Sequence, residues 1–293
     1  MPLDRVLARL RQRVTSPQRA AFLTCFFTGY LIHLFAFTNI IPNSDGLSRV
    51  FDLQQMTVSG RWFLHYASFL NDFTQMPALI GFFSLLFLSL AAAGVVTILG
   101  LHSRALSAFA GALMVAFPCL GYVFLYMFTA SAYCMAIFLA VLAVCLVKRG
   151  GWLRSIAGCV LLALSMGIYQ AYAAVAVALS LLAVLRACLN PRTSLKGITR
   201  LGARMVGFLA VGAALYYAIL QIFLAVKDLE LLDYLGMSEA ESGYPIARLP
   251  GLILTTYKQV IAFFFWPSGS NSFTTPVLVV LDLLALALAV VCF

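Results

Sequence analysis

Long apolar runs alternate with polar connectors along most of this chain. The runs cover residues of about 20–41, 77–100, 105–122, 131–147, 155–169, 171–189, 205–226 and 276–293. Several runs reach the roughly 20 residues that an α-helix needs to cross about 30 Å of hydrocarbon. The pattern predicts an all-α polytopic membrane protein, with residues 1–293 forming a single transmembrane domain of about eight membrane-spanning helices.

The connectors fall into two classes by length. Three are short or of moderate length, at 101–104 and 148–154 and, longer than these, at 190–204, and two are large, at 42–76 and 227–275. If the first run leaves the cytoplasm and each run crosses once, these three connectors are cytoplasmic. The two long connectors are then large periplasmic loops.

Residues 248–266, in the second long loop, combine a few polar positions with a strongly apolar remainder. This pattern is typical of a helix that lies in the plane of the membrane interface, with Tyr257 and Trp266 at the level of the headgroups. The alternative is a short ninth crossing, which would invert the last span. We therefore expect an interfacial helix here.

Composition and charge agree with this topology. The chain is 63% hydrophobic and 10% charged, with a formal net charge of +9, and its mean hydropathy of +1.01 excludes a soluble globular domain. The expected cytoplasmic side holds 14 of the 19 Lys and Arg residues, and the opposite loops hold eight of the ten acids. This split is what the positive-inside rule expects. The basic residues do not gather on a soluble patch, so nucleic acid is excluded as a partner.

The two ends of the chain have different characters. Residues 1–19 carry five arginines and resemble the start of a signal peptide. The run that follows is too long for a signal peptide and lacks a small-x-small cleavage pattern, so 1–19 is expected to be a cytoplasmic tail before an uncleaved span. The last run ends at Phe293 without a basic flank. We therefore expect the chain to be C-terminally incomplete, as a fragment or a shortened product.

Charged side chains gather directly after the first span. Asp45, Arg49, Asp52, Arg61 and Asp72 all lie within residues 43–72. A helix through the first part of this stretch would place the first three on one face, although the same spacing is common in surface ion pairs of little energetic value. A membrane protein with this concentration of charge is expected to hold a polar ligand there.

Two further motifs are candidates for the same site. In Ser59-Gly60-Arg61-Trp62, the glycine allows close approach of the backbone, the arginine offers a fork suited to phosphate, and the tryptophan offers a face for sugar or interface contact. Tyr169 and Gln170 lie at a tight turn between two runs, on the face of the first loop. They either form a polar rim to the same cavity or only cap helices and join an aromatic belt.

Two ionisable residues lie inside apolar runs. Asp282 is expected to face a polar cavity or to be protonated or snorkelling near the interface. His33 is expected to be a hydrogen-bonded residue of helix packing. The seven cysteines lie mostly in apolar runs, without metal-ligand spacing. We expect them to pack as small apolar residues, and we expect no metal site.

Taken together, these motifs resemble a known family. An Asp in Pro42–Gly46, an Arg one turn later, the 59–62 motif, an Asp before the second span at position 72 and Tyr-Gln-Ala at 169–171 resemble the serotype-converting O-antigen glucosyltransferases of bacteria and their phages. The resemblance covers the whole chain. It implies a GT-C-like fold in the bacterial inner membrane, with the N-terminus in the cytoplasm and the active site on the periplasmic face.

The resemblance also implies a reaction and its partners. A sugar, expected to be glucose, passes from a polyprenyl-phosphate-linked donor to a lipid-linked O-antigen or similar surface glycan, with inversion of the anomeric centre. The base would be Asp45, with Asp52 or Asp72 in support, and Arg49 or Arg61 would lie near the donor phosphate. The full set of substrate-binding candidates is Asn43, Arg49, Arg61, Trp62, Tyr169, Gln170 and Lys258. No cofactor is implied, a divalent cation stays open, and membrane lipids are the remaining partners.

Two other classes of function compete with this interpretation. A transporter or a flippase of lipid-linked sugars would place polar residues along several spans and interrupted helices in paired halves. The sequence has no internal repeat and offers only Asp282 and His33 as such residues. A non-catalytic membrane scaffold would account for the early end of the chain but not for the 59–62 motif.

The charge distribution yields a prediction about topology. In a cysteine-free background in intact cells, a cysteine placed within 42–76 should react with a membrane-impermeant thiol reagent, whereas Ser194→Cys should not. The second cysteine should react only after the cells are permeabilised. Labelling of Ser194→Cys in intact cells would overturn the topology.

Overall fold

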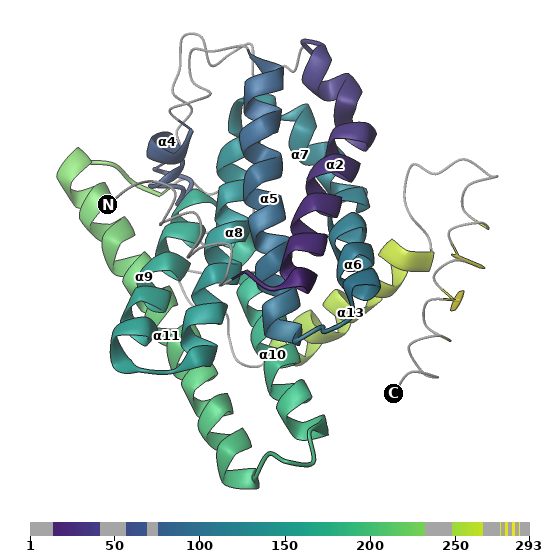
Figure 1. The fold of residues 1–293 in the computed structure, drawn as a ribbon. Helices are drawn as coiled ribbons and strands as arrows, with labels where there is room; N and C mark the ends of the chain where they lie inside the picture. The colour runs from purple at the N-terminus through teal and green to yellow at the C-terminus, as the bar shows by residue number, and fades with distance from the viewer. Residues whose placement is uncertain are drawn as a thin grey trace, which may run out of the picture. The chain divides into compact units, whose positions relative to one another are not determined.

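The computed structural model describes residues 14–41, 57–68, 76–231 and 248–265, together with positions 276, 279–280, 283–284 and 287. Regular secondary structure over these residues is helical (Figure 1). The chain forms two compact units, Met1–Leu232 and Asp233–Phe293, and each is described by itself.

The first unit is a bundle in which most closely packed helix pairs are separated along the chain by at least one other helix. Its elements are α2 (Ser16–Thr38), α4 (Leu64–Ala67), α5 (Pro77–Leu99), α6 (Arg104–Ala116), α7 (Cys119–Leu125), α8 (Met127–Arg149), α9 (Trp152–Ile168), the 3₁₀ turn η1 (Gln170–Tyr172), α10 (Ala173–Leu189) and α11 (Leu195–Lys227). Helix α6 packs on α2, α2 on α5, α5 on α8, α8 on α9, and α9 on α11. Helices α5 and α8 therefore form the centre of the bundle (Figure 1).

Within the described ranges, five helices are long and apolar enough to cross a membrane. They are α2, α5, α8, the segment from η1 through α10, and α11, while α9 is a shorter apolar helix of 17 residues. The structure therefore agrees with the all-helical, polytopic membrane protein that the sequence predicts. The number of eight spans stays a prediction, because most of the last apolar run lies outside the described residues.

The run at 105–122, expected as one span, is broken into two helices. Helices α6 and α7 meet at an angle of 49°. Phe117 at the break is extended, with φ −64° and ψ 129°, and it precedes Pro118. Proline has no N–H to donate to the preceding turn and disfavours helical geometry in the residue before it. Pro118 therefore accounts for the interruption, although the run is continuous in hydropathy.

The connector expected at 190–204 is mostly helical. Helix α11 begins at Leu195, where the Ser194 hydroxyl accepts the backbone N–H of Gly197, and it continues for 33 residues. At 1.5 Å per residue this helix is about 50 Å long. The helix is longer than the hydrocarbon layer is thick. Its basic first turns therefore continue the apolar helix beyond that layer instead of forming a loop.

Small residues allow the helices to approach closely. Gly111 of α6 lies directly against the backbone carbonyl of Ala21 in α2, where a side chain would have no room. Such contacts are typical of helix pairs in membranes, where packing has to replace the hydrophobic effect. The Nε2 of His33 lies 3.0 Å from the Val115 carbonyl oxygen, which confirms the expected packing role of this histidine.

Three cations lie at one end of this bundle, which we call the basic end. Lys148 donates to the Ile98 carbonyl at the end of α5. Arg186 packs against Gly100, which ends the same helix with a positive φ of 58°. Arg204 donates to the Lys148 carbonyl at 3.4 Å. These cations therefore lie at helix C-termini, where the backbone carbonyls and the helix dipole favour positive charge.

The described part of the second unit is mainly helix α13 (Leu249–Phe265). The helix coincides with the segment in which the sequence predicts one, and Tyr257 and Lys258 are exposed on it. Its place in the membrane interface stays a prediction. Asp282 lies outside the described residues.

Candidate functional site

Residues 57–68, called here the anchored loop, are held to the bundle by hydrogen bonds from two sides. The backbone N–H of Phe63 donates to the Gly167 carbonyl at 2.8 Å. The amide of Gln170 donates to the Ser59 carbonyl at 2.9 Å. A third bond comes from α11, where the hydroxyl of a buried tyrosine, Tyr216, donates to the Gly60 carbonyl at 2.9 Å. Because buried backbone groups must be paired, these bonds allow polar loop backbone to enter an apolar bundle.

The loop has a local geometry that only a glycine accepts easily. Gly60 is buried, its N–H donates to the Thr57 carbonyl at 2.9 Å, and its φ is 79°. Positive φ costs a non-glycine residue energy, because the Cβ then crowds the backbone. Leu64 donates to the Arg61 carbonyl at 3.1 Å and begins the short helix α4. The backbone at Gly60 thus approaches α11 closely, as expected, and this allows the Tyr216 hydroxyl to reach the Gly60 carbonyl.

Trp62 is buried, with 5% of its surface exposed. Its ring stacks on Phe223 at a centroid distance of 5.6 Å and on Tyr216 at 6.5 Å. Gly167 leaves room for the indole, because a Cβ at that position would lie 2.7 Å from the ring atom Cε2. The sequence favoured a face open to sugar or interface, but the structure places the ring in the packing that fixes the loop.

Arg61 lies on an aromatic face. Its Cζ lies 4.6 Å from the ring centroid of Tyr169, a cation–π arrangement. The Tyr169 ring is itself stacked on Tyr133 at 5.4 Å and meets Tyr172 edge-on at 5.8 Å. The guanidinium is half-buried, and its buried Nε has no acceptor within the described ranges.

This arrangement has a clear chemical capacity. A guanidinium that stacks on an aromatic ring keeps its N–H groups for another ligand. A guanidinium that is paired with a carboxylate has already used them. No carboxylate of the described residues pairs with Arg61. The site therefore offers a positioned cation with directional donors, which suits a phosphate or another oxyanion.

The structure brings together four of the residues singled out in the sequence: Arg61, Trp62, Tyr169 and Gln170. The five other candidates of the first loop, Asn43, Asp45, Arg49, Asp52 and Asp72, lie outside the described residues, and Lys258 is exposed on α13 of the second unit. The carboxylate half of the site therefore stays a prediction. Among the residues that the structure describes, no group of three or more His, Cys, Asp or Glu could hold a metal ion.

Sequence reasoning missed Tyr216. It is 7% exposed and lies in the middle of the apolar α11, next to a second tyrosine, Tyr217. A buried tyrosine hydroxyl usually needs a partner, so a tyrosine in such a run was a usable signal. Its partner is the backbone of a loop more than 150 positions earlier in the chain, and nothing in the sequence indicates this pairing.

Comparison with known proteins identifies the family. A family model described as glucosyl transferase GtrII matches residues 34–293. No curated protein and no solved structure matches the chain. The family match covers most of the chain, including the anchored loop and the turn at Tyr169. The chain therefore belongs to the glucosyl transferase GtrII family, which confirms the resemblance drawn from the motifs.

The contact between Trp62 and Gly167 gives a prediction. Gly167→Ala should displace the anchored loop, because the new Cβ would lie 2.7 Å from the indole and 3.0 Å from the Cβ of Phe63. In a background where the other two tryptophans, Trp152 and Trp266, are phenylalanine, acrylamide quenching of Trp62 fluorescence should rise.

The control is Gly202→Ala in α11, where a Cβ meets no heavy atom within 4 Å. Quenching of Trp62 should be unchanged in this variant. Equal quenching in the Gly167→Ala protein and its parent would show that the loop does not depend on this contact.

Proposed function

We propose that this member of the glucosyl transferase GtrII family transfers glucose from a polyprenyl-phosphate-linked donor to a lipid-linked O-antigen or a similar surface glycan. Family membership supports transfer of a glucosyl group. The apolar helices support substrates carried by lipids. The observation that carries the proposal further is Arg61, held over the Tyr169 ring at 4.6 Å in the loop that follows the first span.

The proposed reaction is a single displacement. A carboxylate takes the proton of the acceptor hydroxyl, and the hydroxyl oxygen bonds to the anomeric carbon of the donor sugar. The bond from that carbon to the phosphate oxygen breaks, and polyprenyl phosphate leaves with the electron pair. One displacement inverts the anomeric centre and needs no carboxylate nucleophile, in contrast to retaining hydrolases.

We assign the leaving phosphate to Arg61, with Arg49 as its partner. Negative charge grows on the phosphate as the bond breaks, so a cation fixed in place stabilises the transition state more than one that must be reoriented. Gln170 and Tyr169 support this role, because one binds the Ser59 carbonyl and the other underlies the guanidinium. Asn43 and Lys258 stay sequence-based candidates for substrate binding.

We assign the base to Asp45, with Asp52 and Asp72 as supporting acids. Asp45 follows the first span within a few residues, at the level where a lipid-linked donor exposes its sugar. The distribution of Lys and Arg supports a periplasmic site in a bacterial inner membrane. The proposed mechanism uses no cofactor, and a divalent cation at the phosphate would act beside Arg61.

The transporter alternative receives less support from the spans. In the described helices, the buried Ser165 hydroxyl donates to the Ala136 carbonyl at 2.8 Å, and His33 is hydrogen-bonded to the Val115 carbonyl. Both are partners in helix packing, whereas a transport pathway would place such groups along a polar cavity.

The base assignment is tested by Asp45→Asn. The amide is nearly isosteric but does not accept a proton at neutral pH, so transfer should fall by about 100- to 10,000-fold while donor binding is largely kept. The measurement is transfer of labelled sugar from polyprenyl-phosphate donor to lipid-linked acceptor. Asp52→Asn and Asp72→Asn are the comparisons and should cost less. Full activity in Asp45→Asn, with loss in one of the others, would reassign the base.

The phosphate assignment is tested by Arg61→Lys. Lysine keeps the charge but loses the planar fork and its stacking on Tyr169, so donor use should weaken while expression and membrane insertion persist. Steady-state kinetics against donor concentration measure the effect. Arg192→Lys, at an exposed connector position, is the matched control and should behave as the parent. Unchanged donor kinetics in Arg61→Lys would remove Arg61 from the site.

A further inference from the structure

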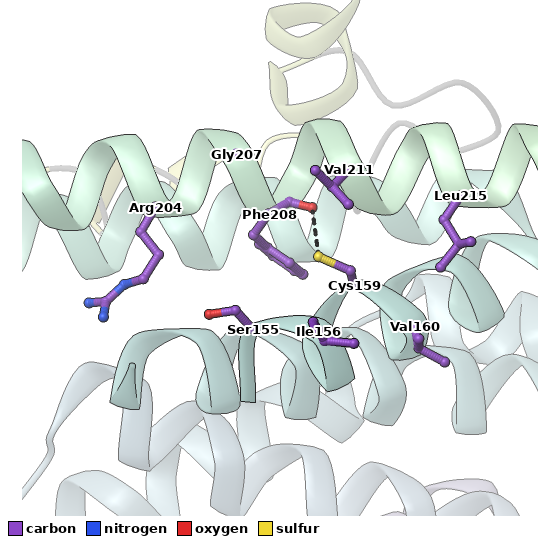
Figure 2. Close-up of a pocket in the computed structure, with 9 residues that line it drawn as sticks. All are labelled: Ser155, Ile156, Cys159, Val160, Arg204, Gly207, Phe208, Val211 and Leu215. Carbon is purple, nitrogen blue, oxygen red and sulfur yellow. Dashed lines mark hydrogen bonds between the residues drawn. The ribbon is translucent and has the colours of Figure 1, made fainter. Parts of the chain in front are cut away.

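A groove runs between α9 and α11. Its volume is about 380 Å³, and its lining includes Ser155, Cys159, Val160, Arg204, Phe208 and Val211. Figure 2 shows these side chains gathered between the two helices, with Arg204 at one end of the row and Leu215 at the other. A volume of this size is in the range of sites that hold small molecules or parts of lipids.

The wall of the groove changes character along its length. Arg204 and Leu215 are 11 residues apart on α11, so they lie about 16 Å apart along its axis. The polar atoms of the wall beyond Arg204 are already used by the protein. The Ser155 hydroxyl donates to the Gly151 carbonyl at 3.1 Å, and the Cys159 thiol contacts the Phe208 carbonyl at 3.8 Å. The surface of the groove is therefore almost entirely apolar, and Arg204 is the charged residue of its lining.

Arg204 brings a positive charge to one end of the groove. Its Nη2 donates to the Lys148 carbonyl at 3.4 Å, and its Nε is buried. Lys196 and Arg200 precede it at four-residue spacing and are exposed. Residues four apart share a face of a helix. The groove thus continues at its polar end into a short basic row.

The charge pattern matches an amphiphile with an anionic head. Basic pockets between membrane helices commonly bind anionic lipid headgroups, with the acyl chains on neighbouring apolar surface. We propose that this groove binds an anionic phospholipid. Its phosphate lies on Arg204, near Lys196 and Arg200, and an acyl chain lies along Gly207, Val211 and the residues facing them on α9.

Position separates this lipid from the sugar donor. Tyr216, which holds the anchored loop at Gly60, is 12 residues after Arg204 and so about 18 Å further along α11. A headgroup at Arg204 is therefore at the opposite end of the helix pair from Arg61. The phospholipid site stands whether or not the proposed transferase reaction is correct.

The test uses the full chain purified in detergent, with phosphatidylglycerol and phosphatidylcholine as probes and native mass spectrometry as the readout. Gly207→Phe should fill the groove, because a Cβ there meets no heavy atom within 4 Å. Retention of phosphatidylglycerol should fall by at least about tenfold, as expected for the loss of an acyl-chain site and a headgroup contact. Arg204→Gln should give a similar loss.

Two controls are matched to these variants. Gly202→Phe also places a ring on α11 where there is open space, but outside the groove lining. Arg192→Gln removes an exposed basic residue of the nearby connector. Both should retain phosphatidylglycerol as the parent does.

Several results would overturn the proposal. Undiminished phosphatidylglycerol binding in Gly207→Phe would place the lipid elsewhere, and equal retention of phosphatidylcholine would remove the role of charge. Displacement of phosphatidylglycerol by polyprenyl phosphate would assign the groove to the donor. A dimer that dissociates in Gly207→Phe would assign it to a second copy of the chain.

Discussion

The packing of Trp62 on Gly167 is the contact on which the described site depends. A loop that follows a membrane span normally stays at the surface, where water satisfies its backbone. Here the indole enters the bundle because position 167 has no side chain, and the loop backbone follows it. Three carbonyl acceptors are then met by Phe63, Gln170 and Tyr216. Burial of an aromatic ring and pairing of the polar backbone stabilise the same conformation, so neither would persist without the other.

This anchoring decides what neighbouring residues can do. Trp62 and Arg61 are adjacent, yet one is buried against Phe223 and the other lies on Tyr169. With the indole fixed in the bundle, the arginine lies on the tyrosine cluster at the turn between α9 and α10. A long side chain loses much rotamer freedom when it binds an anion. Stacking on Tyr169 has already removed part of that freedom, which is the preorganisation that electrostatic catalysis requires.

The sequence predicted the helical membrane architecture because hydrophobic run length reports it directly. The run at 77–100 corresponds closely to α5, where Pro77 begins the helix and Gly100 ends it. The predicted helix boundaries were wrong where a factor other than hydropathy determined the helix. Pro118 interrupts a run that hydropathy alone predicts as one span. Helix α11 begins inside a basic connector, because Lys and Arg oppose membrane insertion but favour helix formation. Residues 59–62 and 169–170 were correctly expected on one face. The burial of Trp62 was not predictable, because it depends on a cavity that Gly167 makes only after folding.

Helices α9 and α11 carry both the loop contacts and the groove, and this links the two ends of the helix pair. Gly167 and Ser155 are 12 residues apart on α9, as Tyr216 and Arg204 are on α11, so each interval is about 18 Å of helix. The loop bridges the pair at one end, through Phe63 to Gly167 and through Gly60 to Tyr216. Toward the other end the two helices stay in contact beside the groove, where the Cys159 thiol lies 3.8 Å from the Phe208 carbonyl oxygen. The loop that carries Arg61 is therefore hydrogen-bonded to both helices of the pair, so its position depends on how α9 and α11 pack against each other.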